Sequence, residues 1–254
     1  MTIVSDPLFY ALAVPAVLAL GLAKGGFSGM GQMALPLLAL VMPPLQAAAI
    51  MLPIMILQDA TAVWVYRHDW SGRVLAVVIP GAVVGVAGAG LVAAHIPGAA
   101  VRLAVGLITL GFVANSWIRA WRVARERPPP SPAAGVFWGA LSGFTSTLAQ
   151  VGGPPFQIYA LAQNMPKMTY VGTNALFFAG MNWMKVIPYV ALGQFSWKGL
   201  GTTLVLVPLA LIANQFGFWL VRRIPQDRFY SLTLWVMFMV SIALIRSGVV
   251  ALTP

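Results

Sequence analysis

The same hydrophobic pattern occurs twice along this chain. Residues 80–97 run from a proline through fifteen mostly apolar residues to a closing Ile-Pro, and residues 208–225 repeat that arrangement. Upstream of these stretches lie two matching loops, Trp70-Ser71-Gly72 and Trp197-Lys198-Gly199. Duplicated hydrophobic units are typical of membrane proteins built from internal repeats, so we expect two related halves.

Composition places both halves in a membrane. Of 254 residues, 60% are hydrophobic and only 8% are charged, whereas about 25% of the residues in a soluble domain are charged. Many apolar runs approach the ~20 residues that a helix needs to cross a bilayer. The alternation expected of a transmembrane barrel is absent from the sequence. We therefore predict an all-α integral membrane protein in which residues 1–254 form a single polytopic domain.

The basic residues are interpreted as topology signals. The net charge of +10 comes from 15 lysines and arginines against 5 acidic residues. Because the arginines stand mostly in short connections between apolar runs, they fit the positive-inside rule and not a nucleic-acid surface. Attraction of anions is a secondary interpretation. No lysine or arginine precedes the first apolar run, so residues 8–26 are expected to be a permanent helix and not a cleaved signal.

Ten apolar runs divide the chain into two repeats, at about 8–121 and 133–249, joined by a basic linker at about 122–132. The runs are predicted at 8–26, 32–42, 46–66, 73–94 and 99–121, then at 133–149, 154–163, 168–190, 198–221 and 229–249. The second run of each repeat is short. A helix of that length covers about half of the ~30 Å hydrocarbon core.

Charge decides how the short runs are counted. If they were re-entrant stubs, the basic loops 119–127 and 222–228 would lie on opposite sides of the membrane. If each completes a crossing, every repeat has five segments, the second repeat is inverted, and both loops lie inside. We therefore predict two inverted repeats of five segments, with both termini outside. The second segment of each repeat is short and follows a glycine-rich break.

The glycine-rich breaks are the predicted substrate site. Residues 24–32 and 150–155 each precede a short run and each contain a glutamine. A helix that starts inside the membrane exposes unpaired N–H groups and a positive dipole end, for which an anion is the natural partner. Close helix packing is the alternative role for such glycines. The predicted substrate-binding residues of the two breaks are Gly29, Gly31, Gln32, Gln150, Gly152 and Gly153.

The motifs resemble those of a known family. The repeated glycine-rich stretch before a proline, the Gly172-Thr173-Asn174 segment and the aromatic-plus-glycine loops resemble the TauE/SafE family of sulfite and organosulfur-anion exporters. The resemblance implies a multi-pass permease of the bacterial cytoplasmic (inner) membrane, and it adds Thr173 and Asn174 to the substrate-binding residues. The chain departs from the pattern at Thr145-Ser146-Thr147 and has Met51-Leu52 where the second half has Thr173-Asn174.

Charged and polar residues inside the runs are further candidates for substrate binding or coupling. Asp59 is the only acidic residue within a predicted span and is expected to pair with Lys24, either as a structural pair or for proton coupling. Lys185 is expected too far toward the outer side to pair with Asp59, where it either snorkels to the interface or offers charge to the substrate. Asn182 and Asn214 either line a cavity or form interhelical hydrogen bonds worth ~0.6 kcal/mol.

The predicted function is transport and not catalysis, because the spans lack clustered His, Asp, Glu or Cys residues. We expect a secondary transporter that exports a small sulfur-containing oxyanion (sulfite, a sulfonate or a sulfocarboxylate) by alternating access. An anion channel and an ion-coupled uptake permease for organic anions are the alternatives. The expected partners are the anion and membrane lipid, without nucleic acid, metal or cofactor, and a homodimer is left open.

Overall fold

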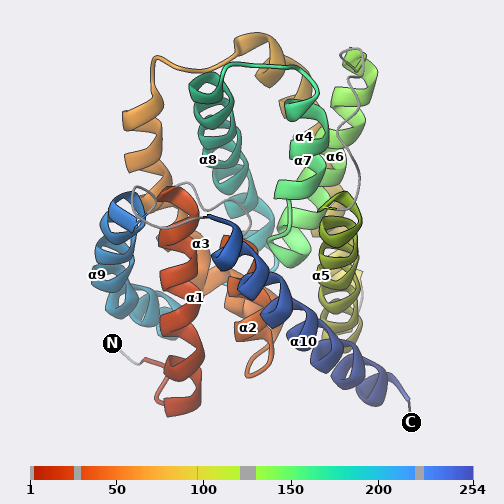
Figure 1. Cartoon of the computed structure of the whole chain (residues 1–254). Coiled ribbons are helices and arrows are strands. Elements are labelled where there is room, and N and C mark those ends of the chain that lie inside the picture. Colours follow the sequence, from red (N-terminus) through yellow and green to blue (C-terminus); the bar gives the residue numbers. More distant parts are fainter. Residues whose placement is uncertain (1–2, 26–29, 96, 121–129, 221–225, 254) are drawn as a thin grey trace.

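The computed structural model describes residues 3–25, 30–95, 97–120, 130–220 and 226–253. Within these ranges every regular element is a helix and there is no strand. The first half contains α1 (Pro7–Gly25), the 3-10 helix η1 (Met30–Met33), α2 (Ala34–Ala39), α3 (Pro44–Tyr66), α4 (Gly72–His95) and α5 (Gly98–Ala120) (Figure 1). The second half contains α6 (Pro132–Ala149), α7 (Gly153–Leu161), α8 (Lys167–Ala191), α9 (Trp197–Leu220) and α10 (Gln226–Leu252).

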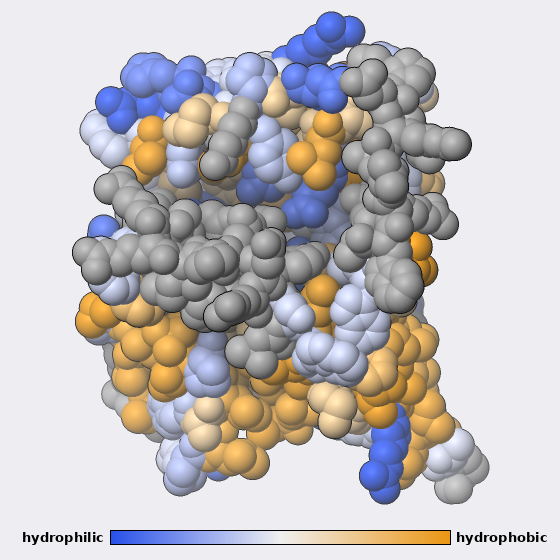
Figure 2. All heavy atoms as spheres, in the orientation of Figure 1, coloured by the Kyte–Doolittle hydropathy of each residue, from blue (hydrophilic) through white to orange (hydrophobic). Residues whose placement is uncertain are grey.

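Six of the described helices are long and apolar enough to cross a membrane, namely α1, α3, α4, α5, α9 and α10. The helices α6 and α8 have 18 and 25 residues, which is a sufficient length. Their mean hydropathy is lowered by serines and threonines in α6 and by asparagines and Lys185 in α8. The face drawn in Figure 2 carries hydrophobic residues over its lower part and hydrophilic residues at its top.

The predicted runs match the observed helices closely, with one difference in the first half. A short second segment follows α1 and another follows α6, as expected. The first of them does not form one helix over 32–42. It starts as the 3-10 helix at Met30 and continues as α2 only to Ala39, and a turn at residues 40–42 leads to Pro43 and Pro44. Two consecutive prolines cannot continue the helix, because they lack the N–H donors and restrict the preceding residue.

Contacts between helices fix their relative directions. Val4 N donates to Thr202 Oγ1 at 3.0 Å and Gly21 abuts Ala213, so α1 and α9 run parallel. Ile50 and Gln58 of α3 bond to Thr203 and Ala210 of α9 in the same order, so α3 is also parallel to α9. These three helices therefore form one group with a common direction.

The opposite direction is shared by α4, α6 and α8. Gly81 and Gly85 of α4 face Val136 and Ala140 of α6 in parallel order. A Cβ added at Gly85 would lie 1.9 Å from the Ala140 carbonyl oxygen, so only glycine permits this approach of the two backbones.

Across the middle of the molecule, α3 and α8 run antiparallel, since Asp59 meets Asn182 while Tyr66 meets Gly172. The hydrophobic core follows these groups and not the two halves of the sequence. One cluster of buried residues combines α4 with α7 and α8, and another combines α1, α2, α3 and α5 with α9 and α10. The fourth helix of each half thus packs with the other half. Through this exchange of α4 and α9, each core contains helices of both halves.

Candidate anion site

The two helix breaks meet in the interior of the molecule. The helix α6 ends at Gln150, whose backbone is left-handed (φ 56°), and α7 begins at Gly153. Two α6 hydroxyls bond to the carbonyl groups of this break: Ser142 Oγ donates to Gly152 O at 2.6 Å, and Thr145 Oγ1 donates to Val151 O at 3.0 Å. A Cβ at Gly153 would lie 2.5 Å from Gln32 Nε2 in the other break. The second break is therefore hydrogen-bonded to α6 on one side, and on the other side it contacts Gln32 of the first break.

A pocket of about 130 Å³ lies where the breaks meet. Its walls come from α1, η1, α3, α7, α8 and the end of α6. The apolar part consists of Leu20, Ala23, Met55 and Phe178, and the remaining part of Lys24, Gly31, Gln32, Gln150, Gly153, Gln157 and Asn174. Six residues proposed from the sequence thus share one cavity, from both halves of the chain. The breaks contribute no large apolar side chain to the pocket, whereas α1 and α8 each contribute both polar and apolar residues.

An ion pair stands beside this pocket. Lys24 Nζ donates to Asp59 Oδ1, and Asn182 Nδ2 donates to Asp59 Oδ2 at 2.5 Å. Asp59 is only 2% exposed, so both carboxylate oxygens are paired within the protein. The predicted pairing of Asp59 with Lys24 is confirmed. The contact with Asn182 adds a residue of the second half to the same group.

Lys185 lies in the interior, which contradicts the expectation that it could reach the membrane interface. The side chain has no exposed surface. Its Nζ donates to Gln150 Oε1 at 2.6 Å and to Ser146 Oγ at 3.1 Å. Residue position along α8 led to the wrong prediction, because the direction of the side chain depends on which face of α8 packs against α6. The expectation that Lys185 forms no direct ion pair with Asp59 agrees with these contacts.

The lysine contact fixes the orientation of the Gln150 amide. An ammonium group only donates, so it must meet the amide oxygen and leave Nε2 as a free donor. This Nε2 is buried and has no hydrogen-bond partner, and the same is true of Gln32 Oε1 and Asn182 Oδ1. Buried polar groups without a partner are rare. An unpaired amide donor on a pocket wall is suited to an oxyanion.

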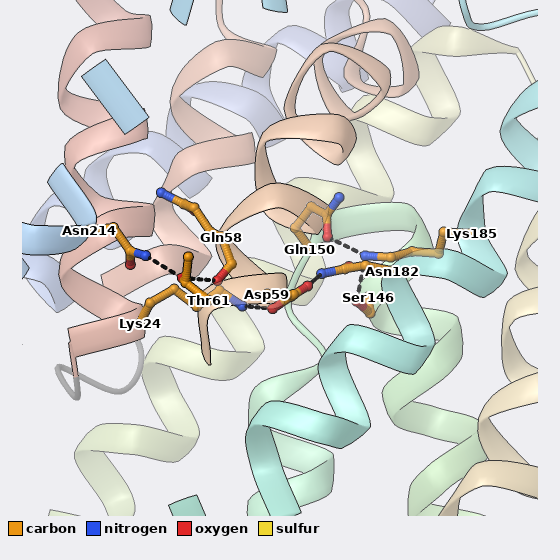
Figure 3. Close-up of polar contacts among 9 residues, drawn as sticks. All are labelled: Lys24, Gln58, Asp59, Thr61, Ser146, Gln150, Asn182, Lys185 and Asn214. Atoms are coloured by element: carbon orange, nitrogen blue, oxygen red, sulfur yellow. Dashed lines mark hydrogen bonds and ion pairs between the residues drawn. The ribbon is translucent and has the colours of Figure 1, made fainter. Parts of the chain in front are cut away.

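These side chains form a band across the molecule. Figure 3 shows it running from Asn214 through Lys24 and Asp59 to Asn182 and Lys185. Asn214 lies at the far end of the band, where Nδ2 donates to Thr61 Oγ1 at 2.8 Å, so it does not reach the pocket.

Two further predicted residues have structural contacts. Thr173 Oγ1 accepts from Ser71 N at 2.9 Å and donates to Thr169 O at 2.6 Å, which ties α8 to the loop before α4. Gly152 accepts from Ser142 and precedes the first residue of α7. Neither residue lines the pocket. Gly29 lies outside the described residues.

Ser146 belongs to the group around the pocket through its bond to Lys185, although its segment departs from the family pattern. The signal was its spacing. Ser142, Ser146 and Gln150 recur every fourth residue, which places them on one face of α6. Gln157 and Phe178 also line the pocket. Among the described residues, no group of three or more His, Asp or Glu side chains could hold a metal ion.

Comparison with known proteins assigns the family. The sequence pattern of the TauE/SafE sulfite exporters matches residues 13–244. The chain belongs to the TauE/SafE sulfite exporter family. This is a family of membrane transporters, and every residue that lines the pocket lies within the matched part. No curated protein and no solved structure matches the chain. The TauE/SafE assignment therefore rests on the family pattern together with the hydrophobic helical fold.

Proposed function

We propose that this TauE/SafE protein is a secondary transporter that exports a small sulfur-containing oxyanion, such as sulfite, a sulfonate or a sulfocarboxylate. The main support for this function is the pocket between the two breaks. Gln150 lines this pocket, its Nε2 has no hydrogen-bond partner, and its Oε1 accepts a hydrogen bond from the buried Lys185. Lys24 and Asn174 supply further donors on the same walls. A cavity with several hydrogen-bond donors on its walls favours an oxyanion, whose ionised oxygens only accept.

We propose further that the halves are inverted repeats. The helix order suggests counterparts: α1 with α6, α3 with α8, α4 with α9, and α5 with α10. The directions deduced above support this pairing, since α1, α3 and α9 run opposite to α6, α8 and α4. The last pair is also antiparallel, because Arg102 bonds to Ser247 at 3.0 Å while Gly106 abuts Ile245. Inverted repeats place equivalent breaks on opposite sides of a central site.

The two ends of the molecule support an orientation with both termini outside. The loop at 67–71 contacts α8 near its start, through Ser71 and Thr173. At the opposite end, Val4, Met42 and the loop at 193–199 surround a second cavity of about 320 Å³. In Figure 1, α1 begins and α10 ends at this lower end. The positive-inside rule places Arg67 and Arg73 on the cytoplasmic side of a bacterial inner membrane.

Transport is proposed to proceed by alternating access without a coupled ion. With a negative cytoplasm, each negative charge that leaves gains ~2.3 kcal/mol per 100 mV. Export of a monoanion is then downhill. Because the cores combine helices of both halves, the moving bodies would be the α4–α6–α7–α8 group and the α1–α3–α9 group, with the pocket between them.

Exchange in liposomes tests this function. Purified protein reconstituted with internal sulfite is expected to release it when external sulfite or methanesulfonate is supplied, and to saturate with concentration. Gln150→Leu removes the pocket amide at similar volume and should abolish exchange, while Gln215→Leu on the exposed surface of α9 serves as the control. Single-channel currents would instead establish an anion channel, and accumulation that requires an inward proton gradient would establish coupled uptake.

A further inference from the structure

Three charged side chains lie in or beside the pocket, and their charges do not sum to zero. Lys24 and Asp59 form an ion pair. Lys185 is bonded only to the neutral partners Ser146 and Gln150. Of the other acidic side chains that the structure describes, Asp6 and Asp69 are exposed, which leaves Asp59 as the buried carboxylate among them. With these groups ionised, two lysines and one carboxylate give the cluster a net charge of +1.

The surplus charge belongs to Lys185. A fully buried ammonium is costly unless an opposite charge and hydrogen bonds compensate it. The hydrogen bonds are present, but among the described residues no carboxylate forms an ion pair with this lysine. The missing element is a single negative charge. The pocket can hold this negative charge near Lys185, because Gln150 both bonds Lys185 and lines the pocket.

Gln150 links Lys185 to the cavity through its amide group. Its amide oxygen takes the lysine bond, and its Nε2 is the buried donor without a partner. A hydrogen bond to the oxygen of an amide polarises the amide and strengthens its N–H donors. An oxyanion bound to Nε2 would thus meet the field of Lys185 through one intervening group.

Asp59 removes positive charge from the pocket, whereas Lys185 adds it. It neutralises Lys24, the cation that lines the cavity directly. Without this carboxylate, two positive charges would face the ligand. Asn182 holds the second carboxylate oxygen at 2.5 Å, so Asp59 is fixed in this role from α8 as well as from α1.

Resting on the proposed anion transport, we propose that the pocket selects monoanions, and that Asp59 sets this valence by cancelling Lys24. One negative charge compensates Lys185. A second would remain without a counter-charge in a low-dielectric cavity and would be repelled by Asp59. The volume of about 130 Å³ suits a small ligand. The expected ligand is therefore a small organic sulfonate or hydrogensulfite, which narrows the proposed substrates to monoanions and disfavours a sulfocarboxylate dianion.

Two ligands of matched shape test the inference. 2-Hydroxyethanesulfonate and sulfoacetate share the same sulfur–carbon–carbon skeleton, but they carry one and two negative charges near neutral pH. Their dissociation constants are measured by calorimetry on the purified full-length protein. The wild type is expected to bind the monoanion at least ten-fold more tightly than the dianion.

Charge variants then separate valence from a structural role. Asp59→Asn raises the count to +2 and should shift the affinity ratio at least ten-fold toward sulfoacetate. The double variant Lys24→Gln/Asp59→Asn returns the count to +1 and should restore the ratio to within three-fold of the wild type. If Asp59 were only structural, both variants would lose affinity for the two ligands in parallel, and the ratio would stay constant. Lys185→Gln lowers the count to zero and should weaken both ligands at least ten-fold.

Failure of the valence inference and failure of the proposed transport function would give different binding results. Binding of neither ligand by the wild type would remove the anion site, and both proposals with it. Equal or tighter binding of sulfoacetate by the wild type, or an unchanged ratio in Asp59→Asn, would leave anion transport standing and overturn the valence inference. Should Asp59→Asn fail to insert, the wild-type ratio and Lys185→Gln decide the question.

Discussion

At the scale of single residues, this protein buries charged side chains in its interior, where each needs a polar or oppositely charged partner. Asp59 is 2% exposed and Lys185 has no exposed surface, yet both lie in helices that are otherwise hydrophobic. Asp59 is held by Asn182 from the other half of the chain, whereas Lys185 is held by Ser146 and Gln150 at the end of α6, within its own half. Such groups are costly in a membrane and are typical of substrate pathways.

Asn174 is expected to bind the anion directly. It lines the pocket and belongs to the segment that resembles the family motif. A hydrogen bond to a charged group contributes about 1.5–3 kcal/mol, so Asn174→Ala should weaken binding of 2-hydroxyethanesulfonate by roughly ten-fold or more, as measured by calorimetry. Gln215→Ala on α9 removes an exposed amide outside the pocket and should have no effect. Unchanged affinity in Asn174→Ala would exclude this residue from the site.

Asp59 is expected to be dispensable for downhill export of a monoanion. Replacement by asparagine leaves Lys24 without its ion pair, but this lysine is 16% exposed and can be hydrated. Because uncoupled export needs no proton carrier, Asp59→Asn should retain most of the wild-type efflux from liposomes. Asp69→Asn, in the exposed loop before α4, is the matched control. Loss of efflux in a correctly inserted Asp59→Asn protein would indicate coupling through this carboxylate.

At the scale of elements, glycines decide which helices can touch. The contact between α4 and α6 is built on glycines spaced four apart: Gly81 and Gly85 of α4 abut the backbone of α6, and Gly139 and Gly143 of α6 abut the backbone of α4. In a bilayer the hydrophobic effect does not drive helices together, so close packing and short backbone contacts must do so. This pairing of α4 with α6 brings a helix of the first half into the core of the second.

A single methyl group in this contact should therefore destabilise the fold. Gly85→Ala would place a Cβ 1.9 Å from the Ala140 carbonyl oxygen, and overpacking of this kind costs about 1–3 kcal/mol. We expect a lower thermal unfolding temperature for the purified protein. Gly88→Ala lies three residues further along the same helix with no atom within 4 Å, and it should be neutral or slightly stabilising. Equal effects of the two substitutions would argue against the glycine contact.

At the scale of the whole molecule, the proposed inverted repeats require two chemically accessible ends on opposite sides of the membrane. The chain contains no cysteine, so single cysteines can be introduced without a background reaction. His68, in the exposed turn after α3, and Lys198, near the start of α9, mark the two ends.

In intact bacterial cells, a membrane-impermeant maleimide should label Lys198→Cys and spare His68→Cys. Sealed inside-out membrane vesicles should give the reverse pattern. Labelling of both positions from the same side would contradict the proposed topology and, with it, the placement of the pocket between two opposed breaks. Equal labelling of both variants in detergent serves as the control for reactivity.

The sequence by itself determined the helices and their breaks. Apolar run length, the positions of glycine and proline, and the duplication located every segment to within a few residues, because these signals act locally along the chain. The breaks predicted Gln32, Gln150 and Gly153 as pocket residues, and the resemblance to the family motif added Asn174. The sequence also predicted the pair of Lys24 and Asp59, each of which lacked another partner within the spans.

Only the tertiary structure decided which faces of the helices meet. The exchange of α4 and α9 between the two cores depends on glycine contacts between segments more than fifty residues apart, which no local pattern encodes. The inward direction of Lys185, the participation of Ser146 and the exclusion of Thr173 and Asn214 from the pocket all follow from that packing. A helix that is apolar on every side has no preferred face in its sequence, so its rotation is set by the neighbours against which it packs.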